Sequence, residues 1–339
     1  EMSACFNLGY MLAEGTEVPA DPPRAVALYQ QACDGGEASG CLNLGLMYRH
    51  GDGVGEDPAR AVDLYQRACD GGEISGCHNL GFMYDEGIGV GQDQVKAAEL
   101  YQRACDGQSM AGCYNLALMY RHGTGVVADQ ERAVALYRQA CDGGDMSGCN
   151  GLGYVYNNGI GVAQDEAKAA ELYQRACDRG DMFGCSNLGI MYDEGSGVGQ
   201  DDARAVALYA RACAGHHPRG CHNLATMYDE GTGVAQDPAR AVELYQEACD
   251  GGELAACVSL GVMYELGTGV AEDVAKAAAL YQSGCDGGQM KGCYDLGLLY
   301  ERGIGVGVDA DRAAELFQKA CDGGEAAACA RPSTAQSGM

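Results

Sequence analysis

The chain has 339 residues and a formal net charge of −26, with 48 acidic side chains against 22 basic ones. A nucleic-acid-binding protein needs Lys and Arg side chains that displace phosphate counterions, so this charge excludes that class. It also opposes contact with anionic membrane surfaces. The acidic charge indicates either a solvated surface that keeps the protein soluble or a surface that attracts a basic partner. No apolar stretch approaches the roughly 18 residues that span a bilayer, so no membrane insertion is expected.

The 19 cysteines follow one spacing from end to end. From Cys5 onward the gaps alternate between 28 and 8 residues, which gives a period of 36. A fixed period of this length predicts stacked repeats in place of one globular core. We therefore expect one repeat domain over residues 1–330 with about nine units, followed by a C-terminal tail at 331–339. Cys5 has no partner at this spacing, so the first unit is expected to be truncated.

The first half of each unit has the pattern of a short helix. In the copy that begins at Cys41, packing residues recur at i, i+3, i+4 and i+7, as Cys41, Leu44, Gly45 and Tyr48. The small residue at position 45 would let two helices approach closely. Gly51 is expected to end this helix.

The second half begins with a helix-start signal. Asp57 precedes Pro58, as an N-cap residue precedes a proline in the first turn, and an Asp recurs there in all nine copies. A second stripe includes Leu64 and Tyr65, so each unit is a helical hairpin that must stack on its neighbours. A basic residue three positions after each Asp is expected to form a structural ion pair; these residues are Arg24, Arg60, Lys96, Arg132, Lys168, Arg204, Arg240, Lys276 and Arg312.

The cysteines flank the turn between successive units. Two antiparallel helices joined by a tight turn bring residues eight apart within disulfide reach. Zinc sites usually combine closer Cys pairs in fours, so neither a metal nor another cofactor is expected. Nine disulfides would place the protein in an oxidising, extracytoplasmic compartment, either periplasmic or secreted. The predicted pairs are Cys33–Cys41, Cys69–Cys77, Cys105–Cys113, Cys141–Cys149, Cys177–Cys185, Cys213–Cys221, Cys249–Cys257, Cys285–Cys293 and Cys321–Cys329.

A candidate binding face lies opposite the packed stripe of the first helix. At 100° per residue, position 43 and the position seven residues later point away from that stripe, and first helices line the concave face of stacked hairpins. Side-chain amides in register could grip an extended peptide backbone. Alternatively, each Asn bonds to an adjacent helix of the stack. The candidate binding residues are Asn43, Asn79, Asn115, Asn187, Asn223, His50 and His122.

Residues 213–221 read CAGHHPRGC and depart from the usual turn. His216 and His217, with His222 nearby, could be considered as metal ligands, but no carboxylate stands at ligand spacing. The sequence contains no motif of a serine hydrolase, a zinc protease or a nucleotide-binding loop, so no catalytic residue is predicted.

The segment NLGLMYRHGDGVGEDPARAVDLYQRAC at 43–69 resembles the Sel1-like repeat, a relative of the tetratricopeptide repeat. The resemblance implies an all-α fold, a right-handed α/α solenoid (superhelix) of 36-residue hairpins that the disulfides staple. It also implies an adaptor for other proteins. With a cysteine pair at each junction, the chain is similar to the secreted cysteine-rich Sel1-like proteins of the Helicobacter type. Those proteins are described as recognised by the host immune system and as penicillin-binding or weakly β-lactam-hydrolysing.

Three functions follow as hypotheses. The first is a non-enzymatic scaffold that binds a peptide or protein partner, favoured to be basic, along its concave groove. The second is a β-lactam-binding protein or weak β-lactam hydrolase, which only the family resemblance suggests. The third is head-to-tail self-association into filaments through poorly covered ends of the stack.

Overall fold

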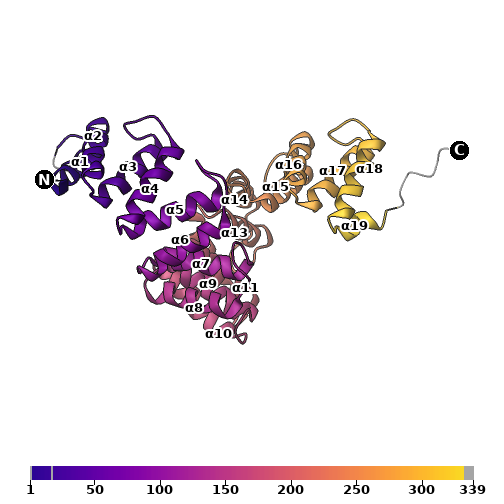
Figure 1. Ribbon diagram of the computed structural model, residues 1–339. Helices are drawn as coiled ribbons and strands as arrows, with labels where there is room; N and C mark the ends of the chain where they lie inside the picture. The colour runs from indigo at the N-terminus through magenta and orange to yellow at the C-terminus, as the bar shows by residue number, and fades with distance from the viewer. Residues whose placement is uncertain (1, 17, 332–339) are drawn as a thin grey trace. The chain divides into compact units, whose positions relative to one another are not determined.

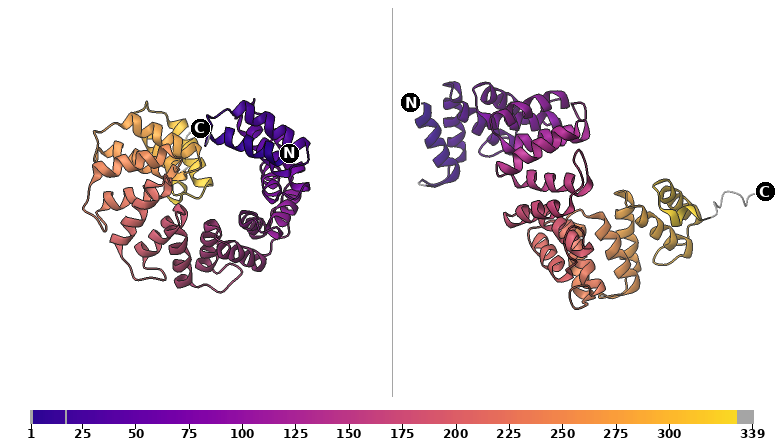
Figure 2. Two further views of the ribbon diagram at one scale, coloured as in Figure 1. Left: turned by 90° about the vertical axis from the view of Figure 1, so that its left-hand side faces the viewer. Right: turned by 90° about the horizontal axis from the view of Figure 1, so that it is seen from below.

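A computed structural model describes residues 2–16 and 18–331. Over these residues the chain forms 19 helices and no strand, which confirms the all-α prediction (Figure 1). The chain divides into two compact units, residues 1–172 and 173–339, with the boundary inside α10. Within each unit the helices follow one another as hairpins (Figure 2). Residues 332–339 of the predicted tail lie outside the described part of the chain, and the right-handed turn of the stack stays a prediction.

Every helix before the last has 13 residues, so the 36-residue period in the sequence is a structural period as well. Unit 1 contains α1 (Met2–Glu14), α2 (Pro22–Asp34), α3 (Ala38–His50), α4 (Pro58–Asp70), α5 (Ile74–Glu86), α6 (Gln94–Asp106), α7 (Met110–His122), α8 (Gln130–Asp142) and α9 (Met146–Asn158). The boundary helix is α10 (Glu166–Asp178). Unit 2 continues with α11 (Met182–Glu194), α12 (Asp202–Ala214), α13 (Pro218–Glu230), α14 (Pro238–Asp250), α15 (Leu254–Leu266), α16 (Val274–Asp286), α17 (Met290–Arg302), α18 (Ala310–Asp322) and α19 (Ala326–Cys329).

The second helix of each hairpin starts at the predicted aspartate. The Asp57 side chain accepts a hydrogen bond from the backbone N–H of Arg60 at 3.0 Å, and Pro58 occupies the first turn. An acceptor here satisfies one of the N–H groups that a helix start leaves unpaired. The same bond recurs at Asp21, Asp93, Asp129, Asp165, Asp201, Asp237, Asp273 and Asp309.

The loop inside each hairpin packs against the hairpin before it. Gly53 has a φ of 69°, and a Cβ atom there would lie 2.4 Å from the carbonyl carbon of Pro22. Glycine is therefore required both by the left-handed backbone and by the close approach of the preceding second helix. This contact ties the loop of one repeat to the helix start of its neighbour.

The core of the stack comes from the predicted stripes. Leu44 and Tyr48 of α3 are buried, as are Leu64 and Tyr65 of α4. A tyrosine equivalent to Tyr65 is buried in most second helices, so it supplies much of the volume between hairpins. Neither stripe would be covered in an isolated hairpin, and stacking therefore provides the stability.

The basic residue that recurs three positions after each N-cap Asp mostly makes a different contact from the predicted one. The Arg60 guanidinium lies 4.4 Å from the ring centroid of Tyr48, in a cation–π contact. Equivalent contacts occur at Lys96, Arg132, Lys168, Arg204 and Lys276. Ion pairs with a neighbouring acid are found at Arg204, Arg240 and Arg312. The predicted ion pair therefore holds at three positions and is wrong as a general rule, because in most repeats the tyrosine in the last turn of the first helix offers its ring face.

Candidate binding face and disulfide junctions

The asparagine row consists of Asn43, Asn79, Asn115, Asn187 and Asn223, which occupy the same position in five first helices. Asn7 of α1 shares this position but is exposed. All five members of the row are half-buried, between the packed stripe and the surface. Two of them lie beside the buried tyrosine of the preceding hairpin: burial raises the pKa of Tyr29 and of Tyr101, and the nearby amides of Asn43 and Asn115 act in the opposite direction. The Asn115 Nδ2 atom is also 3.1 Å from His78 Nε2.

The asparagine row therefore contacts a neighbouring part of the stack and also borders the protein surface. The neighbour-helix alternative has one contact in its favour, between Asn115 of α7 and His78 of α5, and the role of the row in binding stays a prediction. The fifth repeat interrupts the row with Gly151, where a Cβ atom would lie 2.6 Å from the Tyr137 ring. The ring of the preceding tyrosine thus takes the place of a side chain at that position.

His50 and His122 lie in the last turns of α3 and α7 and are exposed. His122 accepts a hydrogen bond from Arg121 Nε at 3.2 Å. Its pKa is lowered by burial and by the adjacent Arg121 guanidinium, so the ring favours the neutral state. The two histidines belong to different repeats, and each is next to an arginine that the sequence analysis did not single out.

Those arginines belong to a second register on the first helices, one residue before the histidine position. Its members are Arg49, Asp85, Arg121 and Asn157 in unit 1, and Asp193, Asp229, Glu265 and Glu301 in unit 2. The register reaches the buried tyrosines of the second helices, because Tyr281 donates to Glu265 Oε2 at 2.6 Å and Tyr209 lies 3.4 Å from Asp193. Comparison of the copies could have found this charge pattern, but not its contact with the tyrosines.

All nine predicted disulfides are present. Cys33 lies at the end of α2 and Cys41 in the first turns of α3, with their Cα atoms 4.6 Å apart. Cys5 carries a free, half-buried thiol, 3.8 Å from Gln31 Oε1.

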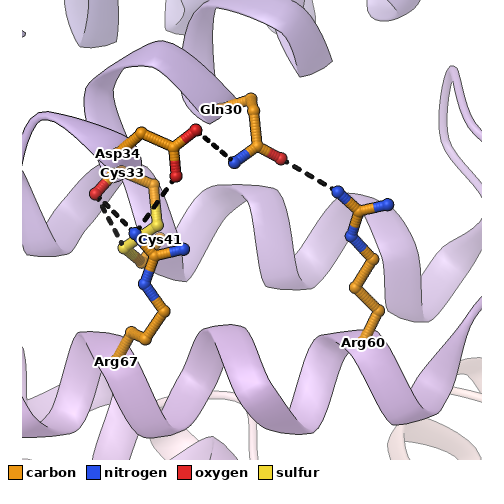
Figure 3. The surroundings of a disulfide bond; sticks show 6 residues. All are labelled: Gln30, Cys33, Asp34, Cys41, Arg60 and Arg67. Carbon is orange, nitrogen blue, oxygen red and sulfur yellow. Dashed lines mark hydrogen bonds and ion pairs between the residues drawn. A yellow bond between two sulfur atoms is a disulfide. The ribbon is translucent and has the colours of Figure 1, made fainter.

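A cationic side chain from the following repeat reinforces at least four of these nine junctions. Arg67 Nη2 donates to the Cys33 carbonyl oxygen at 2.8 Å and to Asp34 at 3.2 Å (Figure 3). Arg103, Arg211 and Lys319 make the corresponding bond to Cys69, Cys177 and Cys285. A cation is favourable here because the carbonyl groups at a helix C-terminus carry partial negative charge.

The divergent turn at 213–221 keeps the backbone of the other turns. His216 adopts a φ of 57°, where most copies have glycine. His217 caps α13, since its Nδ1 accepts from the Gly220 N–H at 3.1 Å, and its ring meets Phe183 edge-on. Within the described residues, the one group of potential metal ligands is Cys213, Cys221 and Glu247. The two sulfur atoms of that group are bonded to each other, so they are not available as thiolates.

Comparison with known proteins decides the family. The Sel1 repeat matches nine segments, residues 3–37, 38–73, 74–109, 111–145, 147–181, 183–217, 218–253, 254–289 and 291–325. The chain belongs to the Sel1 repeat family. Sel1 repeats form a scaffold fold of the protein-interaction type. A search of curated proteins finds no match.

Solved structures agree with this assignment. The chain is 27% identical to c5321, a protective antigen of uropathogenic Escherichia coli with an SLR fold, over 94% of this chain and 76% of that one, with a TM-score of 0.66. A Sel1 repeat protein from Oxalobacter formigenes is 25% identical, with 95% and 91% covered and a TM-score of 0.62. Helicobacter pylori cysteine-rich protein B is 30% identical over 40% of this chain and 97% of its own, with a TM-score of 0.32.

The nine disulfides of this Sel1 repeat chain point to an oxidising, extracytoplasmic environment. No helix among the described residues has the length and apolar character needed to cross a membrane.

Proposed function

We propose that this Sel1 repeat protein is a secreted or periplasmic scaffold that binds an extended polypeptide along the first helices. The observation that carries the proposal is the asparagine row, in which five amides recur in register and stay half-buried. An amide both donates and accepts, so it matches the alternating N–H and C=O groups of an extended backbone. The repeat spacing would let one segment meet several amides in turn.

The charge of the chain favours a partner with basic segments. The net charge is −26, and within unit 2 the first helices α11 and α13 end in Asp193-Glu194 and Asp229-Glu230. Opposite charge accelerates encounter and helps to select among partners. The partner is therefore expected to place Lys or Arg side chains at these helix ends.

Selection from a random 16-residue peptide display library on the oxidised, full-length protein tests the proposal. The asparagine variant is N79A/N115A. The matched control is Q66A/Q102A, which removes two half-buried amides from the second helices α4 and α6 of the same unit. If each amide contributes about 1 kcal/mol, N79A/N115A should weaken the selected peptides roughly thirtyfold, whereas the control should retain them.

The melting temperature of N79A/N115A should stay close to that of the unmodified protein. If stability drops strongly and peptide binding persists, the asparagines act only between helices. The β-lactam alternative stays a prediction, which nitrocefin turnover by the purified protein would test, and light scattering across concentrations would test self-association.

A further inference from the structure

Two first helices of unit 1 end in the same basic pair. Helix α3 ends in Arg49-His50 and α7 in Arg121-His122, two repeats apart. Basic residues complement the C-terminal end of a helix dipole, but α5 and α11 end in Asp-Glu and are equally long. Helix formation alone therefore does not explain the basic pairs.

Each arginine lies on an aromatic ring of the next first helix. The Arg49 Cζ atom is 4.7 Å from the centroid of Phe82 in α5, and the Arg121 Cζ atom is 4.9 Å from that of Tyr154 in α9. A stacked guanidinium can still bind a planar anion through its edge N–H groups. The Nε and Nη2 atoms of Arg121 lie 3.2 and 2.8 Å from His122 Nε2, so an anion would meet this guanidinium on its Nη1 side.

A buried tyrosine hydroxyl lies beside each arginine. Tyr65 and Tyr137 are both 0% exposed, and neither hydroxyl has a hydrogen-bond partner among the described residues. Burial raises the pKa of both, to about 12 for Tyr137, and the arginine beside each acts in the opposite direction. Buried polar groups normally find a partner, and the equivalent hydroxyl of Tyr101, in the repeat between the two, is also without one. What sets Tyr65 and Tyr137 apart is therefore the arginine beside each.

These groups form two matched sites, which we call the arginine pads: Arg49, Phe82 and Tyr65 in the first, and Arg121, Tyr154 and Tyr137 in the second. Arginine has N–H donors and no acceptor, and each tyrosine still has its O–H to donate. An acceptor is the complement of this arrangement. Polypeptides offer main-chain carbonyl oxygens and carboxylates as acceptors, and of the two only a carboxylate has the negative charge and the paired oxygens that match a guanidinium.

We propose that the two arginine pads bind Asp or Glu side chains of the extended polypeptide, an inference that rests on the proposed function. The repeat between them carries Asp85 and Glu86 at the equivalent positions of α5. The segment bound by unit 1 therefore has an acid–base–acid pattern, in contrast to the basic segment expected at unit 2. The pads thus fix which part of the partner lies against which repeat, on a protein that is acidic overall.

The same display library tests the pads through the composition of the selected peptides. The unmodified protein should enrich peptides with Asp or Glu on both sides of a Lys or Arg. R49Q/R121Q should lose this enrichment and bind the best such peptide, fluorescein-labelled, roughly twentyfold more weakly, at about fivefold for each lost arginine–carboxylate contact. R24Q/R179Q is the matched control, because it removes the same charge from two exposed arginines that lie outside the first helices.

A second variant separates binding from packing. Y65F/Y137F removes only the two hydroxyls, so it should weaken the acidic peptide several-fold while the melting temperature stays equal or rises, since a buried unpaired hydroxyl is lost. If peptides are selected without acidic enrichment and R49Q/R121Q binds them unchanged, the proposal that the pads bind carboxylates is wrong and the proposed scaffold function stands. If no peptide is selected at all, the proposed scaffold function and the proposal about the pads are both contradicted.

Discussion

Arg67 of α4 donates a hydrogen bond of 2.8 Å to the main-chain oxygen of Cys33 in α2, across the boundary between two repeats. The accepting carbonyl belongs to a cysteine of the Cys33–Cys41 disulfide. One covalent link therefore joins the second helix of a repeat to the next first helix, and one charged hydrogen bond joins it to the next second helix.

Arg67→Ala should weaken this junction. The arginine is partly exposed, so we expect a loss of roughly 1–2 kcal/mol in the free energy of unfolding. Urea unfolding of the oxidised protein would measure the loss, and hydrogen exchange should locate it near residues 33–41. Arg179→Ala, in the exposed turn after α10, is the control. Equal effects of the two changes would contradict the role of Arg67.

Gly45→Ala should destabilise the second hairpin. A Cβ atom at Gly45 would lie 2.7 Å from the Tyr65 ring, so the ring must shift, and overpacking of this kind costs about 1–3 kcal/mol. Gly55→Ala is the matched control, because a Cβ atom there meets nothing within 4 Å. The difference in urea midpoint between the variants is the measurement, and similar midpoints would show that the contact is relaxed easily.

Removal of one disulfide, as in C69A/C77A, should lower the free energy of unfolding by about 2–3 kcal/mol, because a short loop is no longer closed in the unfolded chain. Thiol titration of the unfolded, unreduced protein should find the single thiol of Cys5 and, after reduction, all 19. A titre near 19 before reduction would overturn the disulfides and the oxidising compartment together.

Acidification should weaken the junction at residues 213–221 through His217. Its pKa is lowered by burial and by Arg219, against a smaller opposite effect of Glu253. The unfolded chain therefore binds a proton more readily than the folded protein, and the stability that His217 provides is present at higher pH. It is lost as the pH falls below about 6.5 and toward the lower pKa of the folded state.

His217→Asn keeps a side chain that can cap α13 but does not titrate. Melting temperatures between pH 8 and 5 should therefore fall less for this variant than for the unmodified protein. All other titratable residues are the same in the two proteins, so the difference between the two curves reports the replacement of His217. Parallel curves would show that His217 contributes no pH dependence.

Comparison of the copies within the chain was enough to predict the elements of the fold. The Asp at 57 and its equivalents marked the helix starts, and the two stripes marked the buried faces, because both signals are local and recur nine times. The contacts of the candidate site were harder to predict from the sequence. The position of Asn115 was predicted, but its approach to Tyr101 and His78 depends on packing between residues distant in sequence.

The sequence by itself determined the helical hairpin, its period, the nine cysteine pairs and the family, since each depends on spacing along the chain. Only the tertiary structure decided which groups meet across repeats. Arg60 lies on a tyrosine ring where an ion pair was expected, and Arg49 shares a surface with Phe82 and a buried tyrosine. The physical reason is that such contacts arise when separate hairpins stack, and spacing along the chain does not encode the direction in which a long side chain turns.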